Sequence, residues 1–330
     1  MGEEDISAVV SLVRAAEVVD GHPPLGEHQW IDLVQGGRAG FAGFVARSPG
    51  SIRLLGYAQL SRGNDSWAVE YVVHPAARAR EDGIAEDLLR AALAEIAEEG
   101  GGHVHLWVPK PTPDVDDITR AVGLRRGRGL DQMRRALPLG EEFADSPRLH
   151  VRPFRLGQDE DAWLALNNRA FDSHPEQGAW DRKTIEERSR QPWFDPDDFL
   201  LYEREERLVA FCWTKIHEDE ESLGEIYVIA VDPAEHGHGL GRALLLTGLD
   251  HLAGRNIATA MLYVDVDQRA AHHLYESIGF TVDHRDQAYV GDVAPTDPAR
   301  AAGESAVDGH APRHDHHRGD GHRHRPEGGR

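Results

Sequence analysis

The stretch GEIYVIAVDPAEHGHGLGR, residues 224–242, carries the strongest structural signal in the chain. Its apolar run Ile226–Val231 has the length and the β-branched content of a buried strand, and the pair Asp232-Pro233 ends that strand. Three glycines crowd the loop that follows: Gly237, Gly239 and Gly241. A glycine-rich turn that leads into a helix leaves backbone N–H groups open to an anion. The stretch therefore predicts a phosphate-binding loop between a strand and a helix.

The spacing of these glycines differs from that of two common phosphate loops. It is Gly-x-Gly-x-Gly rather than Gly-x-Gly-x-x-Gly, and no Lys-Ser or Lys-Thr pair follows. The stretch resembles instead the acetyl-CoA loop of the GNAT acetyltransferases, Gln/Arg-x-x-Gly-x-Gly/Ala, with His236 in the first position. Downstream, LYESIGF at residues 274–280 resembles the second signature of that family, LY-x-x-x-GF. The resemblance implies an α/β fold with a mixed sheet and acetyl-CoA as co-substrate.

The composition favours a soluble protein of two domains. The chain has 330 residues, 40% of them hydrophobic, and no apolar run that could span a bilayer. Its single cysteine, Cys212, excludes an internal disulfide framework, and we expect a cytoplasmic location. The net charge of −21 argues against nucleic acid or an anionic membrane as a partner. We expect a monomer that requires no metal.

The first half of the chain repeats the second half in weaker form. A strand-like run, Trp67–Val73, ends at His74-Pro75 as the strand of the second half ends at Asp232-Pro233. A second match to the acetyl-CoA loop follows at residues 80–85, after a connection two residues longer. We therefore predict two tandem GNAT domains, and the boundaries are 1–138 for the N-terminal domain, 139–148 for a linker, 149–294 for the C-terminal domain and 295–330 for a tail.

Hydrophobic periodicity predicts the secondary structure of both halves. The expected helices are 5–19, 26–35, 84–96, 160–171, 182–190, 243–253 and 269–277. The expected strands are 39–47, 51–61, 67–73, 103–108, 150–154, 199–203, 208–217, 226–231 and 258–264, with a strand-like end to 290. Beyond residue 295 the chain is rich in His, Arg, Gly and Asp, which predicts a disordered His-rich tail; metal binding by this tail is the alternative.

Acyl transfer to an amine requires a base near the amine and an acid for the leaving thiolate. GNAT enzymes place a carboxylate on the strand before the loop and a tyrosine near the second signature. The second half has Glu225 and Tyr275 in these places, and alignment of the halves puts Trp67 and Thr119 opposite them. We therefore predict that the C-terminal half is catalytic. Taken singly, Glu225 could be a solvated strand-end carboxylate and Tyr275 a core aromatic.

Three phrases of the second half resemble the mycothiol synthase family of tandem GNAT proteins. They are HPEQG at 174–178, WTKIH at 213–217 and GEIYVIAVDP at 224–233. The resemblance implies transfer of acetyl to the cysteine amine of cysteinyl-glucosaminyl-inositol, the last step of mycothiol biosynthesis, in a ternary complex. By position, the residues that contact this thiol-bearing pseudodisaccharide would be Glu27, Glu176, Lys215, Glu225 and Tyr275. With Glu27 among them, the acceptor would lie between the two halves.

The resemblance also implies two sets of acetyl-CoA contacts. In the second half these are Ile229, Ala230 and Val231 for the pantetheine arm, and His236, Gly237, His238, Gly239, Leu240, Gly241 and Arg242 for the pyrophosphate. In the first half they are Tyr71, Val72, Val73, Arg80, Glu81, Asp82, Gly83, Ile84 and Ala85. The contacts in the second half would serve catalysis. Those in the first half would hold acetyl-CoA as a structural ligand, or this half would have lost acetyl-CoA.

Other functions remain open at this level. The acceptor could be an aminoglycoside or a protein N-terminus, or the chain could be an acetyl-CoA sensor without turnover. Single residues also have plain alternatives: Glu27 as a helix-dipole carboxylate, Lys215 as an edge charge and Cys212 as a packed thiol.

Overall fold

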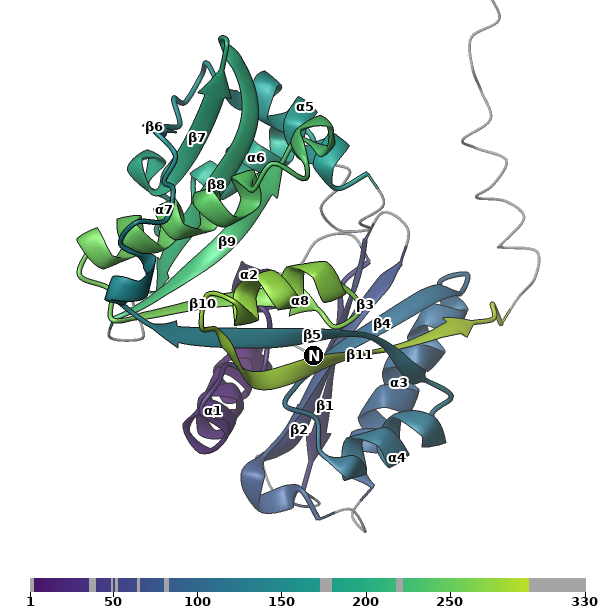
Figure 1. The fold of residues 1–330 in the computed structure, drawn as a ribbon. Coiled ribbons are helices and arrows are strands. Elements are labelled where there is room, and N and C mark those ends of the chain that lie inside the picture. Colours follow the sequence, from purple (N-terminus) through teal and green to yellow (C-terminus); the bar gives the residue numbers. More distant parts are fainter. Residues whose placement is uncertain are drawn as a thin grey trace, which may run out of the picture. The chain divides into compact units, whose positions relative to one another are not determined.

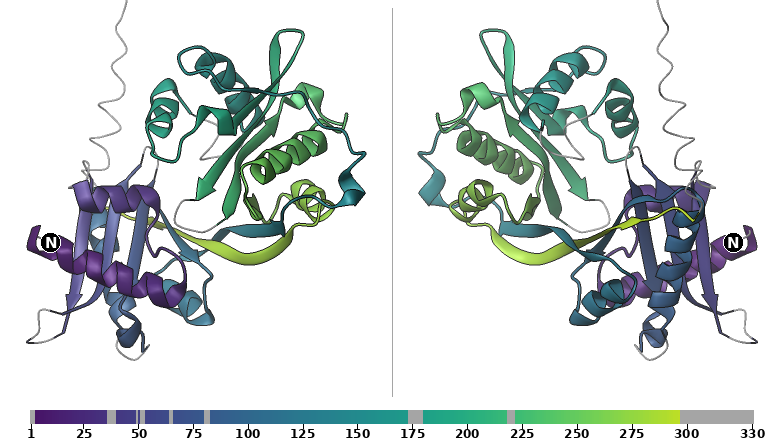
Figure 2. Two further views of the ribbon diagram at one scale, coloured as in Figure 1. Left: turned by 90° about the vertical axis from the view of Figure 1, so that its left-hand side faces the viewer. Right: turned by 90° about the vertical axis from the view of Figure 1, so that its right-hand side faces the viewer.

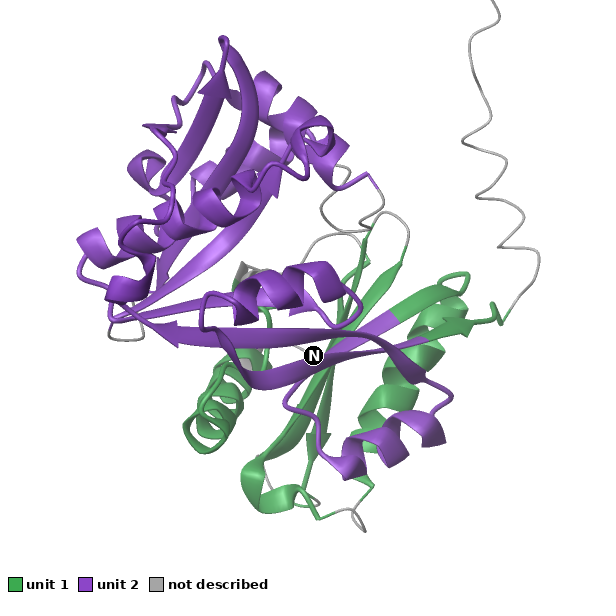
Figure 3. Ribbon diagram, in the orientation of Figure 1, with its two compact units in different colours: residues 1–104, 291–330 green, residues 105–290 purple. Residues whose placement is uncertain are grey.

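The computed structural model of the chain describes residues 3–35, 40–48, 50, 53–63, 66–79, 83–172, 180–217 and 222–296. The chain forms two compact units, residues 1–104 with 291–330 and residues 105–290 (Figure 3). The border between these units lies inside the strand β4 (Gly102–Pro109). The predicted domain boundaries, 1–138 and 149–294, describe where the sequence repeats and not which residues contact one another. They therefore stay a prediction.

The elements follow the predicted order closely (Figure 1). Residues 1–104 form α1 (Glu3–Asp20), α2 (Glu27–Gln35), β1 (Ala42–Arg47), β2 (Leu54–Arg62), β3 (Trp67–Val73), α3 (Ile84–Glu98) and the start of β4. Residues 105–290 contain α4 (Pro113–Ala121), β5 (Arg125–Ala136), β6 (Arg152–Pro153), α5 (Glu160–Ala170), α6 (Arg182–Ser189), β7 (Phe199–Arg204), β8 (Arg207–His217), β9 (Leu223–Val231), α7 (Leu240–Gly254), β10 (Thr259–Asp265), α8 (Arg269–Glu276) and most of β11 (Thr281–Val293).

In the first unit, helices cover both faces of the antiparallel strands β1, β2 and β3 (Figure 2). Neighbouring residues on β2 point to opposite faces, which assigns one helix to each face. Tyr57 is fully buried in a cluster with Val9 and Leu12 of α1. Gly56 points the other way, where a Cβ atom would lie 2.7 Å from Leu88 of α3. The glycine therefore lets α3 pack closely on the sheet.

The second unit uses the same arrangement with larger side chains. On β8, Cys212 points toward α7. If Gly248 of α7 carried a Cβ atom, that atom would lie only 2.6 Å from the Cys212 sulfur, so glycine allows the close contact. Phe211 and Trp213 point to the opposite face and pack with Trp163 of α5 at ring distances of 5.4 and 6.0 Å. Two separate hydrophobic clusters result, one on each face of β8 and β9. The sheet is thus fixed between α7 and α5, and its backbone is a rigid support for side chains at its ends.

The strand order within the second unit is β4-β11-β5-β10-β9-β8-β7-β6. β5 comes from the first predicted repeat, yet it pairs antiparallel with β10 and β11, the last two strands of the second repeat. The final strands of the two repeats are therefore interleaved. Hydrophobic periodicity assigned no element to residues 125–136 or 113–121, so it missed the strand β5 and the helix α4.

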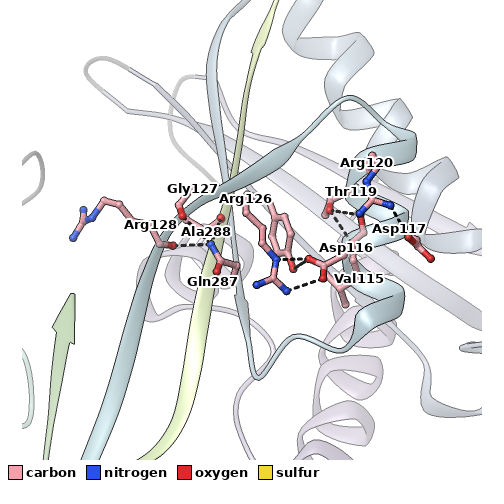
Figure 4. A network of polar contacts seen from close by, with 11 residues as sticks. Val115, Asp116, Asp117, Thr119, Arg120, Arg126, Gly127, Arg128, Gln287 and Ala288 are labelled. Carbon is pink, nitrogen blue, oxygen red and sulfur yellow. Dashed lines mark hydrogen bonds and ion pairs between the residues drawn. The ribbon is translucent and has the colours of Figure 1, made fainter. Parts of the chain in front are cut away.

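Polar contacts explain how an arginine-rich strand can be central. The segment RRGRGLDQMRRA of β5 carries five arginines, and three of them, Arg126, Arg128 and Arg134, pair with carboxylates. Arg126 donates to both oxygens of Asp116 on α4 at 2.7 and 2.6 Å, and Arg128 Nε donates to Asp265 at 2.8 Å. The amide of Gln287 donates to the carbonyls of Gly127 and Arg128 where the register of β11 shifts (Figure 4). These polar pairs occupy positions where a half-buried strand usually has alternating apolar residues. That alternation is the pattern by which a strand is predicted from sequence, and β5 lacks it.

Candidate active site

The strands β9 and β10 separate part-way along their length. Their parallel pairing covers three residue pairs, from Thr259–Leu223 to Met261–Glu225, although β9 continues to Val231 (Figure 1). Along the remainder of β9 the antiparallel pairing with β8 continues as far as Val231. The backbone groups on the β10 side of Ile229–Val231 therefore have no pairing partner on β10, and this break in the strand pairing is called the opening below. An extended amide-containing chain could pair there as a strand does.

The glycine loop lies at the end of β9 and leads into α7. Gly237 and Gly239 have φ values of +82° and +75°, the left-handed region that favours glycine. A Cβ atom on either of them would meet nothing within 4 Å, so the backbone of the loop faces open space. Gly239 caps α7 without a side-chain hydrogen bond, and the first turn of this fully described helix contains no acidic residue. The free N–H groups and the positive end of the helix dipole suit a pyrophosphate.

Two histidines hold the loop together. His236 Nε2 donates to the carbonyl of Val231 at 3.1 Å, and His238 Nδ1 donates to the carbonyl of Glu235 at 3.3 Å. His236 stands where the family pattern has Gln or Arg, and its bond to the strand end closes the turn. Arg242, in the first turn of α7, donates to the hydroxyl of Ser277 at 2.8 Å and so ties this helix to the end of α8.

Glu225 lies at the last residue pair before β9 and β10 separate. It is 7% exposed, and its Oε2 atom lies 2.9 Å from Nε2 of His217. Lys215 is its direct partner across the β8–β9 pair, so both side chains lie on the same face. The Lys215 ammonium lies 4.6 Å from the ring centre of Trp193 and 5.8 Å from that of Tyr227. A buried carboxylate, a cation and aromatic rings therefore share one end of the sheet.

Tyr275 lies on α8 and belongs to the core cluster on the α7 side of the sheet. It is 9% exposed, and its ring packs edge-on against Phe280 at 6.0 Å. Burial raises the pKa of its phenol to about 12, and the nearby Cys212 adds to the increase. The phenol therefore keeps its proton at neutral pH, as a general acid must. Cys212 is itself fully buried, which confirms that it is a packed thiol.

Comparisons with known proteins agree with this geometry. A model of the acetyltransferase (GNAT) family matches residues 161–280. A mycothiol acetyltransferase from Acidimicrobium ferrooxidans is 42% identical over 286 residues, which cover 85% of this chain and 92% of that protein. A mycothiol acetyltransferase from Thermobispora bispora is 44% identical over 282 residues, covering 84% of this chain and 92% of that protein. The chain belongs to the mycothiol acetyltransferase family.

Solved structures of more distant proteins share the fold of this mycothiol acetyltransferase family member. A GCN5-related N-acetyltransferase from Sphaerobacter thermophilus matches with a TM-score of 0.67 at 21% identity, over 89% of this chain and 95% of that one. A tandem GNAT protein from the clavulanic acid biosynthesis pathway matches with a TM-score of 0.62 at 17% identity, over 89% and 97% of the two chains. The predictions of the family and of a mixed α/β GNAT fold are confirmed.

The structure brings together four elements of the predicted site within residues 105–290. Glu225 and Lys215 pair across β9 and β8 where β9 parts from β10, the backbone of Ile229–Val231 continues from there toward the α7 loop, and Tyr275 lies in the core beside α7. The roles of these residues stay predictions for this member of the mycothiol acetyltransferases. Glu176 lies outside the described residues. Glu27 begins α2 in the other unit, and the position of its side chain is also outside what the structure describes.

The loop of the first half differs from that of the second. Gly83 caps α3 in the left-handed conformation, with φ of +62° and open space around a Cβ atom, as Gly239 does for α7. However, the first turn of α3 contains Glu86 and Asp87, which place negative charge where a pyrophosphate would lie. Arg80, Glu81 and Asp82 lie outside the described residues. The contrast favours the second loop as the one that serves the mycothiol acetyltransferase reaction.

Strand register revises one alignment of the halves. The pairing of β8 with β9 shifts by one residue beside Trp213, whereas the pairing of β2 with β3 is regular. Counted by cross-strand partners, Ala68 rather than Trp67 corresponds to Glu225. Thr119 does correspond to Tyr275, because each carbonyl accepts bonds from the residues three and five positions later. The first half lacks both candidate groups in either alignment.

Sequence reasoning missed two residues beside Glu225. His217 was part of the family phrase WTKIH without a role, and its hydrogen bond follows only from the strand pairing. Tyr263 on β10 is 41% exposed, and its hydroxyl accepts a bond from Gln132 at 2.9 Å. Partial burial raises the pKa of Tyr263 to about 12, and the charges of Asp286 and Glu225 add to this. Every second residue of a strand lies on the same face. Counting in this way along 213–217 and 259–265 would have placed His217 and Tyr263 on the face that carries Glu225.

Two expectations concern what the chain lacks. None of the helices in the described part is long and apolar enough to cross a membrane. Among the described residues no group of three or more His, Cys, Asp or Glu side chains could hold a metal ion. Residues 297–330, which include nearly all of the predicted His-rich tail, are outside the described part. The expectations about metal and about tail disorder therefore stay predictions.

Proposed function

We propose that the second half of this chain transfers the acetyl group of acetyl-CoA to the cysteine amine of cysteinyl-glucosaminyl-inositol, in a ternary complex. Membership of the mycothiol acetyltransferases supports acetyl transfer in mycothiol biosynthesis. The position of Glu225 carries the assignment to this half, because it lies where β9 and β10 part, on the strand that leads into a loop suited to pyrophosphate. An acceptor amine that reaches Glu225 would thus meet a thioester held in the opening.

The open backbone suits acetyl-CoA at two points. The β9 groups of Ile229–Val231 would pair with the amides of the pantetheine arm, and the first-turn N–H groups of α7 would bind the pyrophosphate. Both contacts use main-chain atoms, so they depend on the glycines of the loop and on the strand separation. Neither Gly237 nor Gly239 has a side chain that would fill the cradle.

Glu225 acts as the general base. An ordinary α-amine is mostly protonated near neutral pH, with a pKa near 8, and it must lose a proton before attack. A carboxylate at the acceptor end of the opening takes that proton directly or through one water. The neutral amine then attacks the thioester carbonyl, and no covalent enzyme intermediate is formed.

Tyr275 acts as the general acid. Its raised pKa keeps the phenol protonated, so it donates to the CoA sulfur as the carbon–sulfur bond breaks. The overall reaction consumes an ammonium group and a thioester and yields an amide, a free thiol and one proton. Of the two protons that the ammonium loses, one replaces the proton that Tyr275 donates and the other goes to solvent.

Acceptor recognition rests on charged side chains that can bind hydroxyl groups. Lys215 offers three donors beside Glu225, and a polyhydroxylated acceptor needs donors and acceptors for each buried hydroxyl. Glu27 and Glu176 would supply further hydrogen-bond acceptors for these hydroxyls, as the family resemblance implies. Tyr263, exposed at the same end of β10, offers a hydroxyl at the rim.

The test is product identification with several amines. The full chain is incubated with acetyl-CoA and cysteinyl-glucosaminyl-inositol, and separately with an aminoglycoside and a peptide that has a free N-terminus. We expect the N-acetylated pseudodisaccharide by mass, with far less product from the other amines. Efficient acetylation of another amine, with none of this acceptor, would contradict the proposed substrate. Tight acetyl-CoA binding without turnover on any amine would favour a sensor.

A further inference from the structure

Glu225 has a hydrogen-bond partner that no family motif assigns. His217 ends β8, and its backbone partner across the sheet is Leu223, so Glu225 is its diagonal neighbour on the same face. The distance from His217 Nε2 to Glu225 Oε2 is 2.9 Å. Diagonal neighbours in a sheet are within reach of each other only when both side chains are long, as here.

The direction of this bond follows from the chemistry of the two groups. An ionised carboxylate can only accept, so Nε2 of His217 carries the hydrogen and donates it. The Glu225 side chain is 10% exposed and that of His217 is 25% exposed, so one end of the pair is buried and the other reaches solvent. A carboxylate this buried needs a donor to offset the loss of water.

The bond also fixes which carboxylate oxygen is used for which purpose. With Oε2 bonded to His217, the other oxygen, Oε1, keeps its lone pairs for an incoming amine. Glutamate has three rotatable side-chain bonds, and without an anchor the carboxylate would sample several orientations. Among the described residues, the charged and titratable neighbours include Lys215 from β8 and Tyr263 from β10. The ammonium of Lys215 lies over the ring of Trp193.

We infer that His217 is a positioning residue: its Nε2–H group holds the Glu225 carboxylate in the orientation that lets Oε1 take the acceptor proton. The inference rests on the proposed function of Glu225 as base. His217 itself touches neither the acceptor nor acetyl-CoA in this account. His217 therefore affects the rate of the chemical step and does not affect the binding of acetyl-CoA.

Two substitutions separate this role from simple packing. His217→Gln keeps an N–H donor at about the same reach, whereas His217→Leu removes the donor. A matched control is His251→Leu, because His251 on α7 makes the same kind of bond, Nε2 to Asp198 Oδ1 at 2.7 Å, with a side chain 23% exposed. His251 lies in the last turn of α7, at the opposite end of the helix from the glycine loop, and Asp198 ends a short 3-10 helix before β7.

The experiment measures kcat, KM for acetyl-CoA and the thermal unfolding midpoint for wild type and the three variants. We expect His217→Leu to lower kcat by about tenfold or more, a fraction of the usual contribution of a general base, with KM for acetyl-CoA within about twofold. His217→Gln should recover most of the loss, and His251→Leu should leave kcat unchanged.

The outcomes distinguish this inference from the proposed function. A wild-type rate in His217→Leu, or an equal loss in the Gln and Leu variants, overturns the positioning role and leaves the proposed function standing. A wild type that acetylates only another amine contradicts the proposed acceptor, and the His217 comparison is then made with that amine. A wild type that acetylates no amine contradicts both.

Discussion

Lys215 and Glu225 are direct cross-strand partners in the antiparallel pair of β8 and β9. Their side chains emerge on one face, yet the ammonium lies 4.6 Å from the ring centre of Trp193. A cation over an aromatic ring is held there by the negative potential of the ring face. Lys215 is thereby positioned to bind an acceptor hydroxyl beside the base.

The first prediction concerns the ring beneath Lys215. Trp193→Ala should raise KM for the acceptor by about 5- to 30-fold, because a partly desolvated cation–π contact contributes about 1–2 kcal/mol. Trp193→Phe keeps a ring face and should stay within about threefold of wild type. Steady-state kinetics with the acceptor varied measure both. Equal KM values in Trp193→Ala and wild type would show that the ring does not position Lys215.

The second prediction compares the two glycine loops. Gly239→Glu should abolish turnover, because a glutamate would fill the cradle and repel the pyrophosphate. Gly83→Glu in the first half is the matched control, since both glycines are left-handed helix caps with open surroundings. The backbone strain of about 1–2 kcal/mol is similar in the two variants, so it cancels.

The measurement for this pair is turnover together with acetyl-CoA binding by calorimetry. We expect Gly83→Glu to retain turnover and Gly239→Glu to lose it. Loss of turnover in Gly83→Glu alone would assign the reaction to the first half and would contradict the account.

The third prediction concerns the leaving group. Tyr275→Phe should lower kcat by about 100-fold, the lower end for general acid catalysis, with acetyl-CoA affinity within about twofold. Because the pKa of Tyr275 is raised to about 12, its ionisation should not lower the rate at any pH up to about 9. A kcat–pH profile of wild type and variant, with calorimetric affinities, measures this. Unchanged kcat in the variant would remove Tyr275 from the mechanism.

The fourth prediction concerns stability. Glu70 on β3 accepts a bond from the backbone N–H of Gly26 at 3.0 Å, and burial raises its pKa to about 7. The folded state therefore binds this proton more tightly than the unfolded state does, so the contribution of Glu70 to stability falls as pH rises from about 5 through 7. Glu70→Gln, which still accepts the bond, should lose this dependence.

The corresponding measurement is the thermal unfolding midpoint of wild type and Glu70→Gln at pH 5 and pH 8. At pH 8 the variant should be more stable by on the order of 1–3 kcal/mol, and at pH 5 the two should agree. A variant less stable at pH 8 than wild type would show that the charged form of Glu70 is favoured in the fold.

The sequence allowed most of this fold to be predicted, because the glycine loops and the apolar strands follow simple periodicities. Glu225 and the loop at Gly237 and Gly239 were found in this way, and the structure places Glu225 near the start of β9 and the loop after its end. The strand β5 was missed because arginines paired with carboxylates replace its apolar pattern. His217 was missed because its partner is set by strand register, which one sequence does not specify.

Acetyl transfer to cysteinyl-glucosaminyl-inositol by wild type and Glu225→Gln tests most directly whether Glu225 is the base of this reaction; product mass is measured because the acceptor already carries a thiol. Glu203→Gln, a strand glutamate on β7 paired with Arg152, is the control. We expect normal product with Glu203→Gln and a loss of about 100-fold or more in kcat with Glu225→Gln, at nearly unchanged acetyl-CoA affinity. Wild-type turnover by Glu225→Gln would contradict this role of Glu225.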